Sequence, residues 1–277
     1  MIIGTNEAIS AIYYALWQGG YEYASLARDT AHMEALAAVR GDVKHPFFAH
    51  ARQSTCEAYA FWPRAALLET AAFHVDRANA CFTDFDDLHR KIMTAPNVTD
   101  GERSADFWQW LADFPAALCE VLEHPGFKRY RAWAEEWIHM QNQRYKHELS
   151  RIECCLMVCR ERYDSPLKDV QVLIDPIKCV YSADYHVVGE TFVFSSGRFQ
   201  AESVIHEYLH HVVHPAVVKH REQVLRKPRQ YPELDASYYA AGQLYAFEEH
   251  TVRQLTQLAM ADNLPEELDT FVQQLIR

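Results

Sequence analysis

Residues 201–215 read Ala-Glu-Ser-Val-Ile-His-Glu-Tyr-Leu-His-His-Val-Val-His-Pro. Apolar residues recur here at intervals of three and four, the period of an amphipathic helix over Ala201–Val213. His206 and His210 are four residues apart, so both imidazoles lie on one helix face and can reach the same cation. Glu207 follows the first histidine, where a carboxylate can take a proton from a metal-bound water. The stretch therefore predicts a metal-binding helix.

The same five-residue pattern can also arise by chance. A random chain with 15 histidines in 277 residues would contain it on the order of one time in twenty. The alternative is an ordinary helix with two histidines and a solvated glutamate. Two flanking features favour the metal site. A short strand, Glu190–Phe194, precedes the helix and ends in Ser-Ser-Gly, which can break the strand and cap the helix. A later helix, about Leu234–Ala261, carries the adjacent acids Glu248 and Glu249.

Either acid of the later helix could complete the ligand set. A catalytic zinc usually has three protein ligands and one open position, and two histidines with a glutamate form a standard set. On a helical wheel, Glu248 lies near the middle of the apolar arc and Glu249 on its flank. Burial of an unpaired carboxylate is costly, so both positions suggest a nearby cation. Periodicity alone slightly favours Glu248.

The whole chain has the composition of a folded protein with a sizeable core. Hydrophobic residues make up 49% and aromatic residues 13%, which argues against disorder. The net charge of −11 argues against a nucleic-acid partner, because phosphate binding requires a clustered basic face. No run approaches the 18 apolar residues of a membrane span, and the first residues lack a basic secretory segment, so we expect a cytoplasmic protein without membrane contact. The seven cysteines show no disulfide spacing and are expected to be reduced and buried.

The sequence changes texture near Asp164. Before it, helical periodicity predicts a helical region over residues 1–165. After it, β-branched and aromatic residues predict a small sheet, followed by further helices, in residues 166–277. The helices expected in the first region are Glu7–Gln18, Glu22–Arg40, Pro46–Phe61, Ala65–Phe82, Asp106–Glu123 and Lys128–Tyr163. The strands expected in the second region are Val170–Ile174, Cys179–Tyr181 and His186–Phe194, and its helices are Ala201–Val213, Ala216–Leu225, Leu234–Ala261 and Pro265–Ile276.

This order predicts an α+β fold that is mostly α-helical. A helical first half is followed by a small sheet, the histidine helix and the glutamate-bearing helix. We expect the two regions to pack as one compact unit.

The segment Val204–His211 resembles the HExxH helix of the gluzincin zinc metallopeptidases. In those families a strand precedes the helix, and a later helix supplies a glutamate as third ligand. The resemblance is closest to a little-characterised bacterial metallopeptidase family in which a short apolar run and a proline follow the motif, as Val212–Pro215 does here. That family's second signature is a glutamate followed four residues later by arginine, which Glu249 and Arg253 fit. The resemblance covers about Lys168–Gln257.

The resemblance implies a zincin-like region and zinc-dependent hydrolysis of a peptide or protein substrate. His206, His210 and Glu249 would bind Zn²⁺, and Glu207 would act as general base. We predict Glu249 as the third ligand, with Glu248 as the alternative. Many gluzincins have asparagine where Glu248 stands here, and the Gly-rich substrate motif of some relatives is absent from this sequence.

Other residues near the motif have open roles. His211 and His214 could donate hydrogen bonds around the site or be solvated at the helix end. Arg253 could pair with a nearby acid or hold a substrate carboxylate. Tyr238 and Tyr239 could donate a hydroxyl to an oxyanion or serve in packing.

Two other functions also stay open. A protein that binds metal for stability or sensing would have the same ligands without turnover. A helical interaction module would carry the motif by accident and bind no stoichiometric metal. For a peptidase, the strand Glu190–Phe194 could bind an extended peptide by edge pairing.

Overall fold

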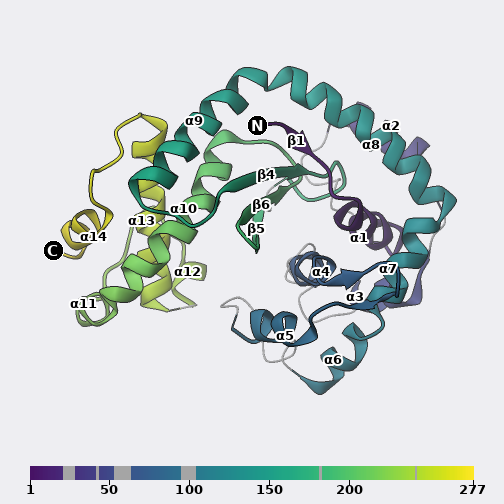
Figure 1. The fold of residues 1–277 in the computed structure, drawn as a ribbon, viewed down its shortest axis with the longest axis horizontal. Helices are drawn as coiled ribbons and strands as arrows, with labels where there is room; N and C mark the ends of the chain where they lie inside the picture. The colour runs from purple at the N-terminus through teal and green to yellow at the C-terminus, as the bar shows by residue number, and fades with distance from the viewer. Residues whose placement is uncertain (21–28, 42–43, 53–63, 95–103, 181–182, 241) are drawn as a thin grey trace.

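The computed structural model describes residues 1–20, 29–41, 44–52, 64–94, 104–180, 183–240 and 242–277. At its centre is a four-stranded mixed sheet with the strand order β1-β4-β6-β5 (Figure 1). The strands are β1 (Ile3–Gly4), β4 (Asp169–Ile174), β5 (Ala183–Val188) and β6 (Thr191–Ser196). β1, β4 and β6 are parallel, and β5 runs antiparallel to β6. Helices dominate the described chain, so the predicted α+β, mostly helical class is confirmed.

Two hydrophobic cores lie on opposite faces of the sheet. Successive strand residues point to opposite faces, so β6 places Phe192 and Phe194 in one core and Val193 in the other. The side chains of β4 also alternate between the two cores: Leu173 lies in the same core as Val193, and Ile174 lies in the same core as Phe192. We call the core that contains Val193 the first core and the core that contains Phe192 the second core. Helices of the first half build most of the first core. Most of the second core comes from α9 (Lys146–Arg162), α10 (Ala201–Lys219) and α13 (Gln243–Met260).

Among the described residues, seven helices precede residue 125. They are α1 (Glu7–Gln18), α2 (Thr30–Ala38), α3 (Pro46–Arg52), α4 (Arg64–Ala72), α5 (Phe85–Thr94), α6 (Ala105–Leu111) and α7 (Phe114–Glu123). α1 has its predicted bounds, because the Asn6 side chain accepts hydrogen bonds from the first-turn amides. α2 and α3 confirm parts of the longer helices predicted over Glu22–Arg40 and Pro46–Phe61, whose residues 22–28 and 53–61 lie outside the described residues. The helix predicted over Asp106–Glu123 is two helices, since α7 begins anew with Pro115 in its first turn.

The helix predicted over Ala65–Phe82 ends at Ala72, so its second half is wrong. An antiparallel hairpin follows, formed by β2 (Val75–Asp76) and β3 (Cys81–Phe82). The Asp76 carboxylate accepts hydrogen bonds from two backbone amides of the turn. This local side-chain bonding stabilises the chain reversal in place of a further helical turn.

α8 (Pro125–Arg144) and α9 (Lys146–Arg162) arch across the sheet from the first group of helices to the second (Figure 1). The sequence predicts one helix over Lys128–Tyr163, but the chain bends at Tyr145, where φ is −105° and ψ is 15°. The Tyr145 ring packs against Phe199, with the ring centroids 4.9 Å apart. The boundary proposed at residue 165 stays a prediction. Both β1, which pairs with β4, and α9 lie before it yet contribute to the second core.

β5 and β6 form a hairpin about Gly189, whose φ of +60° favours glycine. The single strand predicted over His186–Phe194 is therefore two strands. β6 pairs with β4 on one side and with β5 on the other, so the prediction that Glu190–Phe194 offers a free edge is wrong. Within the described part of the chain, the unpaired edge at this end of the sheet belongs to β5.

α10 (Ala201–Lys219) contains the histidine motif and continues through Pro215, where the sequence predicts a break. Proline cannot donate a helical hydrogen bond, but Val212, Val213 and Val217 on either side of it are buried in the second core. Packing of this face stabilises the helix across the proline. The later helices are α11 (Arg221–Arg226), α12 (Ala236–Ala240), α13 (Gln243–Met260) and α14 (Leu268–Ile276).

α13 lies beside α10 and is the longer of the two helices that replace the predicted helix Leu234–Ala261 (Figure 1). Gly242, with φ of +105°, separates α12 from α13. Among the described helices, none is both long and apolar enough to cross a membrane.

Six of the seven cysteines lie in the described residues, and all six are free thiols. Cys159 and Cys179 are buried as expected. Cys81 and Cys154 are exposed, and Cys119 and Cys155 are only half-buried, so the expectation of buried thiols is wrong for these four. The strand predicted over Cys179–Tyr181 is not formed at its first two residues, and its third lies outside the described residues.

Candidate metal centre

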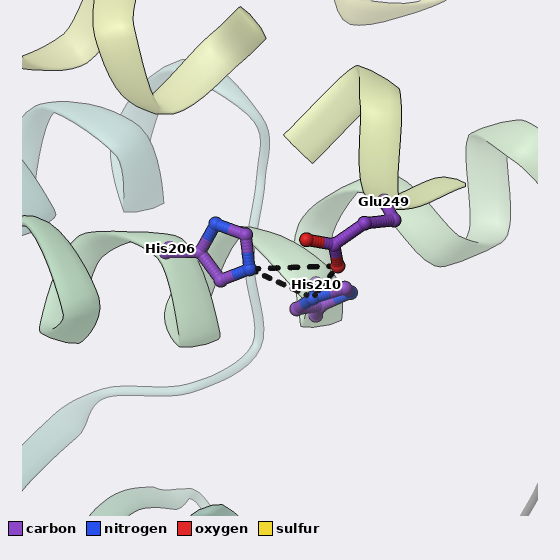
Figure 2. Close-up of side chains that lie close together, drawn as sticks. All are labelled: His206, His210 and Glu249. Carbon is purple, nitrogen blue, oxygen red and sulfur yellow. Dashed lines mark hydrogen bonds and ion pairs between the residues drawn. The ribbon is translucent and has the colours of Figure 1, made fainter. Parts of the chain in front are cut away.

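α10 and α13 together bring two imidazoles and one carboxylate to a single point. His206 and His210 point from successive turns of α10, and Glu249 reaches them from α13 (Figure 2). The two imidazole Nε2 atoms are 3.3 Å apart. Glu249 Oε2 lies 3.4 Å from the Nε2 of His210 and 3.6 Å from that of His206. These three residues form a group that could hold a metal ion.

The packing of α10 fixes the direction of its histidines. Ile205, Tyr208 and Leu209 lie on the helix face opposite the two histidines and are buried in the second core. The Tyr208 ring meets Phe192 of β6 edge to face, with centroids 5.2 Å apart. Because the opposite face of the helix is buried against the sheet, the histidine face is turned toward α13.

Glu248 lies on the other side of the His210 ring from Glu249. Its Oε1 is 3.2 Å from His210 Nδ1, and its Oε2 is 2.8 Å from His214 Nδ1. His210 therefore keeps Nε2 free to face His206 and Glu249 while Nδ1 is held by Glu248. A carboxylate in this position fixes the tautomer and the orientation of a ligand histidine. The alternative ligand of the sequence analysis thus faces the outer nitrogen, and Glu249 is the acid within the group of three.

Burial and opposite charges control the protonation of this group. Burial disfavours charge on Glu249, but hydrogen bonds from His206, His210 and Arg253 hold its pKa well below the usual range. Burial also disfavours a charged His210, yet Glu248 and Glu249 raise its pKa to about 10. An imidazolium cannot ligate a cation, so binding of a metal would displace a proton from His210.

Glu207 faces the same space but is not one of the three grouped residues. Burial raises its pKa to about 7, although the imidazoles of His210 and His206 oppose that shift. Its carboxyl group makes no hydrogen bond with any other residue for which the structure gives a position. A carboxyl group with a pKa near neutrality can both take up and return a proton.

A cavity of about 430 Å³ extends from the group of three between α10 and α13. Its lining includes His206, Glu207 and Glu249, so it is continuous with the candidate metal position. Glu202 and Glu233 add two further carboxylates. The cavity is therefore acidic, and through it a ligand could approach the group.

Arg253 is fixed to Glu249 by an ion pair. Its Nε lies 2.7 Å from Glu249 Oε1, and its other nitrogens donate to the Tyr238 hydroxyl at 2.9 Å and to the Glu233 carbonyl at 2.8 Å. The reading in which Arg253 pairs with a nearby acid is therefore confirmed. Tyr238 lines the cavity, whereas the Tyr239 hydroxyl accepts a hydrogen bond from the Tyr231 amide at 2.6 Å, which supports its packing role.

The two remaining histidines of the motif region differ from each other. The His214 side chain is largely exposed but bonds to Glu248, which raises the pKa of this imidazole. His211 is half-buried, and burial lowers its pKa. Neither residue belongs to the group that could hold the ion.

Two tyrosines that the sequence analysis did not single out lie beside the group. Tyr185 of β5 stacks nearly parallel to the His210 ring, with centroids 6.5 Å apart and an interplanar angle of 11°. Burial and the nearby Glu207 and Glu248 raise its pKa to about 12. Tyr245 precedes Glu249 by one turn of α13, and burial with the charge of Glu249 raises its pKa as well. Both hydroxyls stay protonated at neutral pH, so both can act as hydrogen-bond donors.

A four-residue spacing from Glu249 could have indicated Tyr245. Tyr185 could not be found from its local sequence, because its position depends on how β5 pairs with β6 and packs against α10.

Comparisons with known proteins add no further assignment. No protein-family model, curated protein or solved structure matches the chain. The resemblance stated from the sequence therefore rests on the motif and on the group of two histidines and one glutamate that could hold a metal ion.

Proposed function

We propose that this chain is a zinc-dependent metallopeptidase that hydrolyses peptide bonds with a metal-activated water. The observation that carries the proposal is the grouping of His206, His210 and Glu249, with the carboxyl of Glu207 facing the same cavity. Two histidines and a glutamate leave a four-coordinate metal one position for water, as catalysis requires.

The separations within the group support zinc as the metal. Two ligands about 2.0–2.1 Å from a tetrahedral zinc lie about 3.3–3.4 Å apart. The three separations between the nitrogen and oxygen atoms are 3.3, 3.4 and 3.6 Å. A zinc ion would therefore fit with little movement of the side chains. Imidazole and carboxylate are both ligand types that zinc accepts.

Glu207 would move the proton in this reaction. A bound zinc ion would lower the pKa of its water toward about 7 and polarise the substrate carbonyl. Glu207 would accept a proton from the attacking water and deliver it to the leaving amine. Burial raises the pKa of Glu207 to about 7, and a carboxyl group with a raised pKa can both take up and return a proton.

Tyr185 and Tyr245 would stabilise the oxyanion that forms at the attacked carbonyl. Their raised pKa values keep both hydroxyls protonated and able to donate. The free edge of β5 also offers unpaired backbone groups beside His210, where an extended peptide could add as a further strand.

The cavity suggests a substrate with a cationic group near the cleaved bond. Glu202, Glu207, Glu233 and Glu249 all line it, and the one arginine of the lining, Arg253, is already bonded to Glu249 and Tyr238. A lysine or arginine side chain, or a free amino terminus, would place its positive charge among these acids. Acetylation of the terminus separates the two sources.

A peptide-library digest with wild type and Glu207→Gln tests the proposal. Wild type with zinc should cleave, and the variant should bind zinc equally well but lose about 10²- to 10⁴-fold in rate, the usual contribution of a general base. Unchanged turnover in the variant would exclude Glu207 as the base. Zinc binding without cleavage of any peptide would instead favour a structural or sensing metal site.

A further inference from the structure

A buried cluster of charges lies on the face of the sheet that is turned away from the metal helix. Glu69 lies on α4, and Lys178 lies in the segment between β4 and β5. Neither side chain has any exposed surface, and Lys178 Nζ lies 2.7 Å from Glu69 Oε1. The same ammonium lies 2.6 Å from Asp184 Oδ2 of β5. His186 of β5 reaches the second Glu69 oxygen, with Nε2 2.8 Å from Oε2. Glu69 thus contacts β5 in two ways. It bonds directly to His186, and it bonds to Lys178, which in turn bonds to Asp184.

The register of β5 connects this cluster to the candidate metal centre. Asp184 and His186 are two residues apart and point to the same face, toward the first core. Tyr185 lies between them and points to the opposite face, where its ring stacks on His210. The position of Tyr185 against the metal helix is therefore set by the two neighbours that Glu69 holds.

Backbone pairing alone holds β5 weakly. It is an edge strand of the described sheet, where β6 is the strand bonded to it. The backbone at Lys178, by contrast, is closely confined: a Cβ on Gly197, in the turn between β6 and α10, would come within 2.0 Å of the Lys178 carbonyl oxygen. The Lys178 backbone thus lies against the turn that precedes the metal helix, and its ammonium donates to Asp184 of β5 and, at 3.2 Å, to Ser195 of β6.

Because its members are charged, the cluster is better suited to fixing the position of β5 than to adding stability. Buried ion pairs are often no more stable than well-packed apolar side chains of the same size. Burial nevertheless requires that Glu69, Lys178 and Asp184 keep their mutual contacts, since separation would leave a charge unpaired in the core. Such a cluster permits one position of the strand and disfavours others.

We infer that Glu69, from the helical first half, is a positioning residue for the proposed active site: through Lys178 and His186 it fixes β5, and with it Tyr185 and the peptide-binding edge, against α10. The inference rests on the proposed peptidase function. Glu69 itself is fully buried and touches neither the cavity nor the group of three.

The test compares Glu69→Gln with Asn142→Leu. Asn142 holds the opposite edge strand of the same sheet: its side chain accepts from the Ile3 amide and donates to the Ile3 carbonyl, both at 2.8 Å. Glu69→Gln should raise KM for a cleaved peptide by about tenfold and should also lower kcat, because displacement of Tyr185 weakens its bond to the oxyanion, while bound zinc changes less than about twofold. Asn142→Leu should leave KM unchanged. His186→Leu keeps the Glu69–Lys178 pair and should raise KM by a smaller factor than Glu69→Gln. It replaces Glu69→Gln in the test if that variant does not fold.

Hydrogen exchange on the same proteins tests the anchoring without any turnover. Residues 183–188 should exchange faster in Glu69→Gln, and residues 3–4 should do so in Asn142→Leu. If wild type cleaves no peptide, the proposed function fails, and the exchange still decides whether Glu69 holds β5. The inference is overturned if β5 exchange is unchanged in the folded variant, if KM stays within about twofold of wild type, or if Asn142→Leu raises KM equally.

Discussion

Glu69→Gln should destabilise the folded chain by about 3 kcal/mol at pH 7. Burial opposes charge on Glu69, but Lys178 and His186 lower its pKa from 4.5 to about 2. That difference between the unfolded and folded states corresponds to about 3 kcal/mol of stability. The loss observed when one partner of a buried pair is removed, about 3–5 kcal/mol, agrees with this value.

The same shift fixes the pH dependence. Because the folded-state pKa is the lower one, the stabilisation is fully present above pH 4.5 and is lost as the pH falls toward 2. The difference between wild type and Glu69→Gln should therefore shrink over this window. Glu123→Gln is the control, since Glu123 pairs with Lys128 on the surface and its side chain is 81% exposed; it should produce no measurable change.

Denaturant unfolding followed by circular dichroism, with EDTA present throughout, measures these differences from pH 2 to pH 7. A loss of less than about 1 kcal/mol in Glu69→Gln at pH 7 would refute the reasoning. So would a loss that does not depend on pH, because the cluster would then contribute nothing through the charge of Glu69.

Three further predictions follow from the candidate metal centre. Tyr245→Phe should retain zinc and lower kcat by about 10- to 100-fold, measured under saturating peptide, because it removes one donor to the oxyanion; zinc lost along with activity would point to a structural role instead. Glu202→Gln combined with Glu233→Gln should lower kcat/KM about tenfold for lysine- and arginine-containing peptides but not for their neutral counterparts, and equal losses on both would contradict the charge assignment. Apparent zinc affinity should rise about tenfold per pH unit between pH 7 and pH 9, since His210, with a pKa of about 10, must release a proton to bind; calorimetry in buffers of different ionisation enthalpy would show that proton, and a flat profile would argue against ligation by His210.

The features that local patterns predicted are those that depend on one helix at a time. The three- and four-residue spacing located α10 and placed His206 and His210 on one face. The apolar arc of α13 correctly indicated that Glu248 and Glu249 are both buried. It could not tell which of them faces the histidines, because that depends on how α13 is rotated against α10. Glu249, favoured by the resemblance, lies in the group, and Glu248 lies on the outer nitrogen of His210.

The features that the sequence did not predict depend on contacts between distant segments. β1 pairs with β4 across more than half the chain, and two residues in a strand leave no periodicity to detect. The free edge was assigned to the wrong strand, because strand order is set by tertiary pairing. The contact of Glu69 with Lys178 joins α4 to the segment between β4 and β5, and no local sequence pattern connects these two parts of the chain. Helix continuation through Pro215 likewise depends on burial of the neighbouring valines, which outweighs the local preference of proline.

The central claim is that His206, His210 and Glu249 bind one zinc ion. Elemental analysis of purified wild type beside His206→Ala and Glu249→Ala tests it most directly, with circular dichroism to show that all three proteins are folded. The account predicts about one zinc per wild-type chain and a loss of most of it in each variant. Wild-type protein without stoichiometric metal, or variants that retain it in full, would contradict the account.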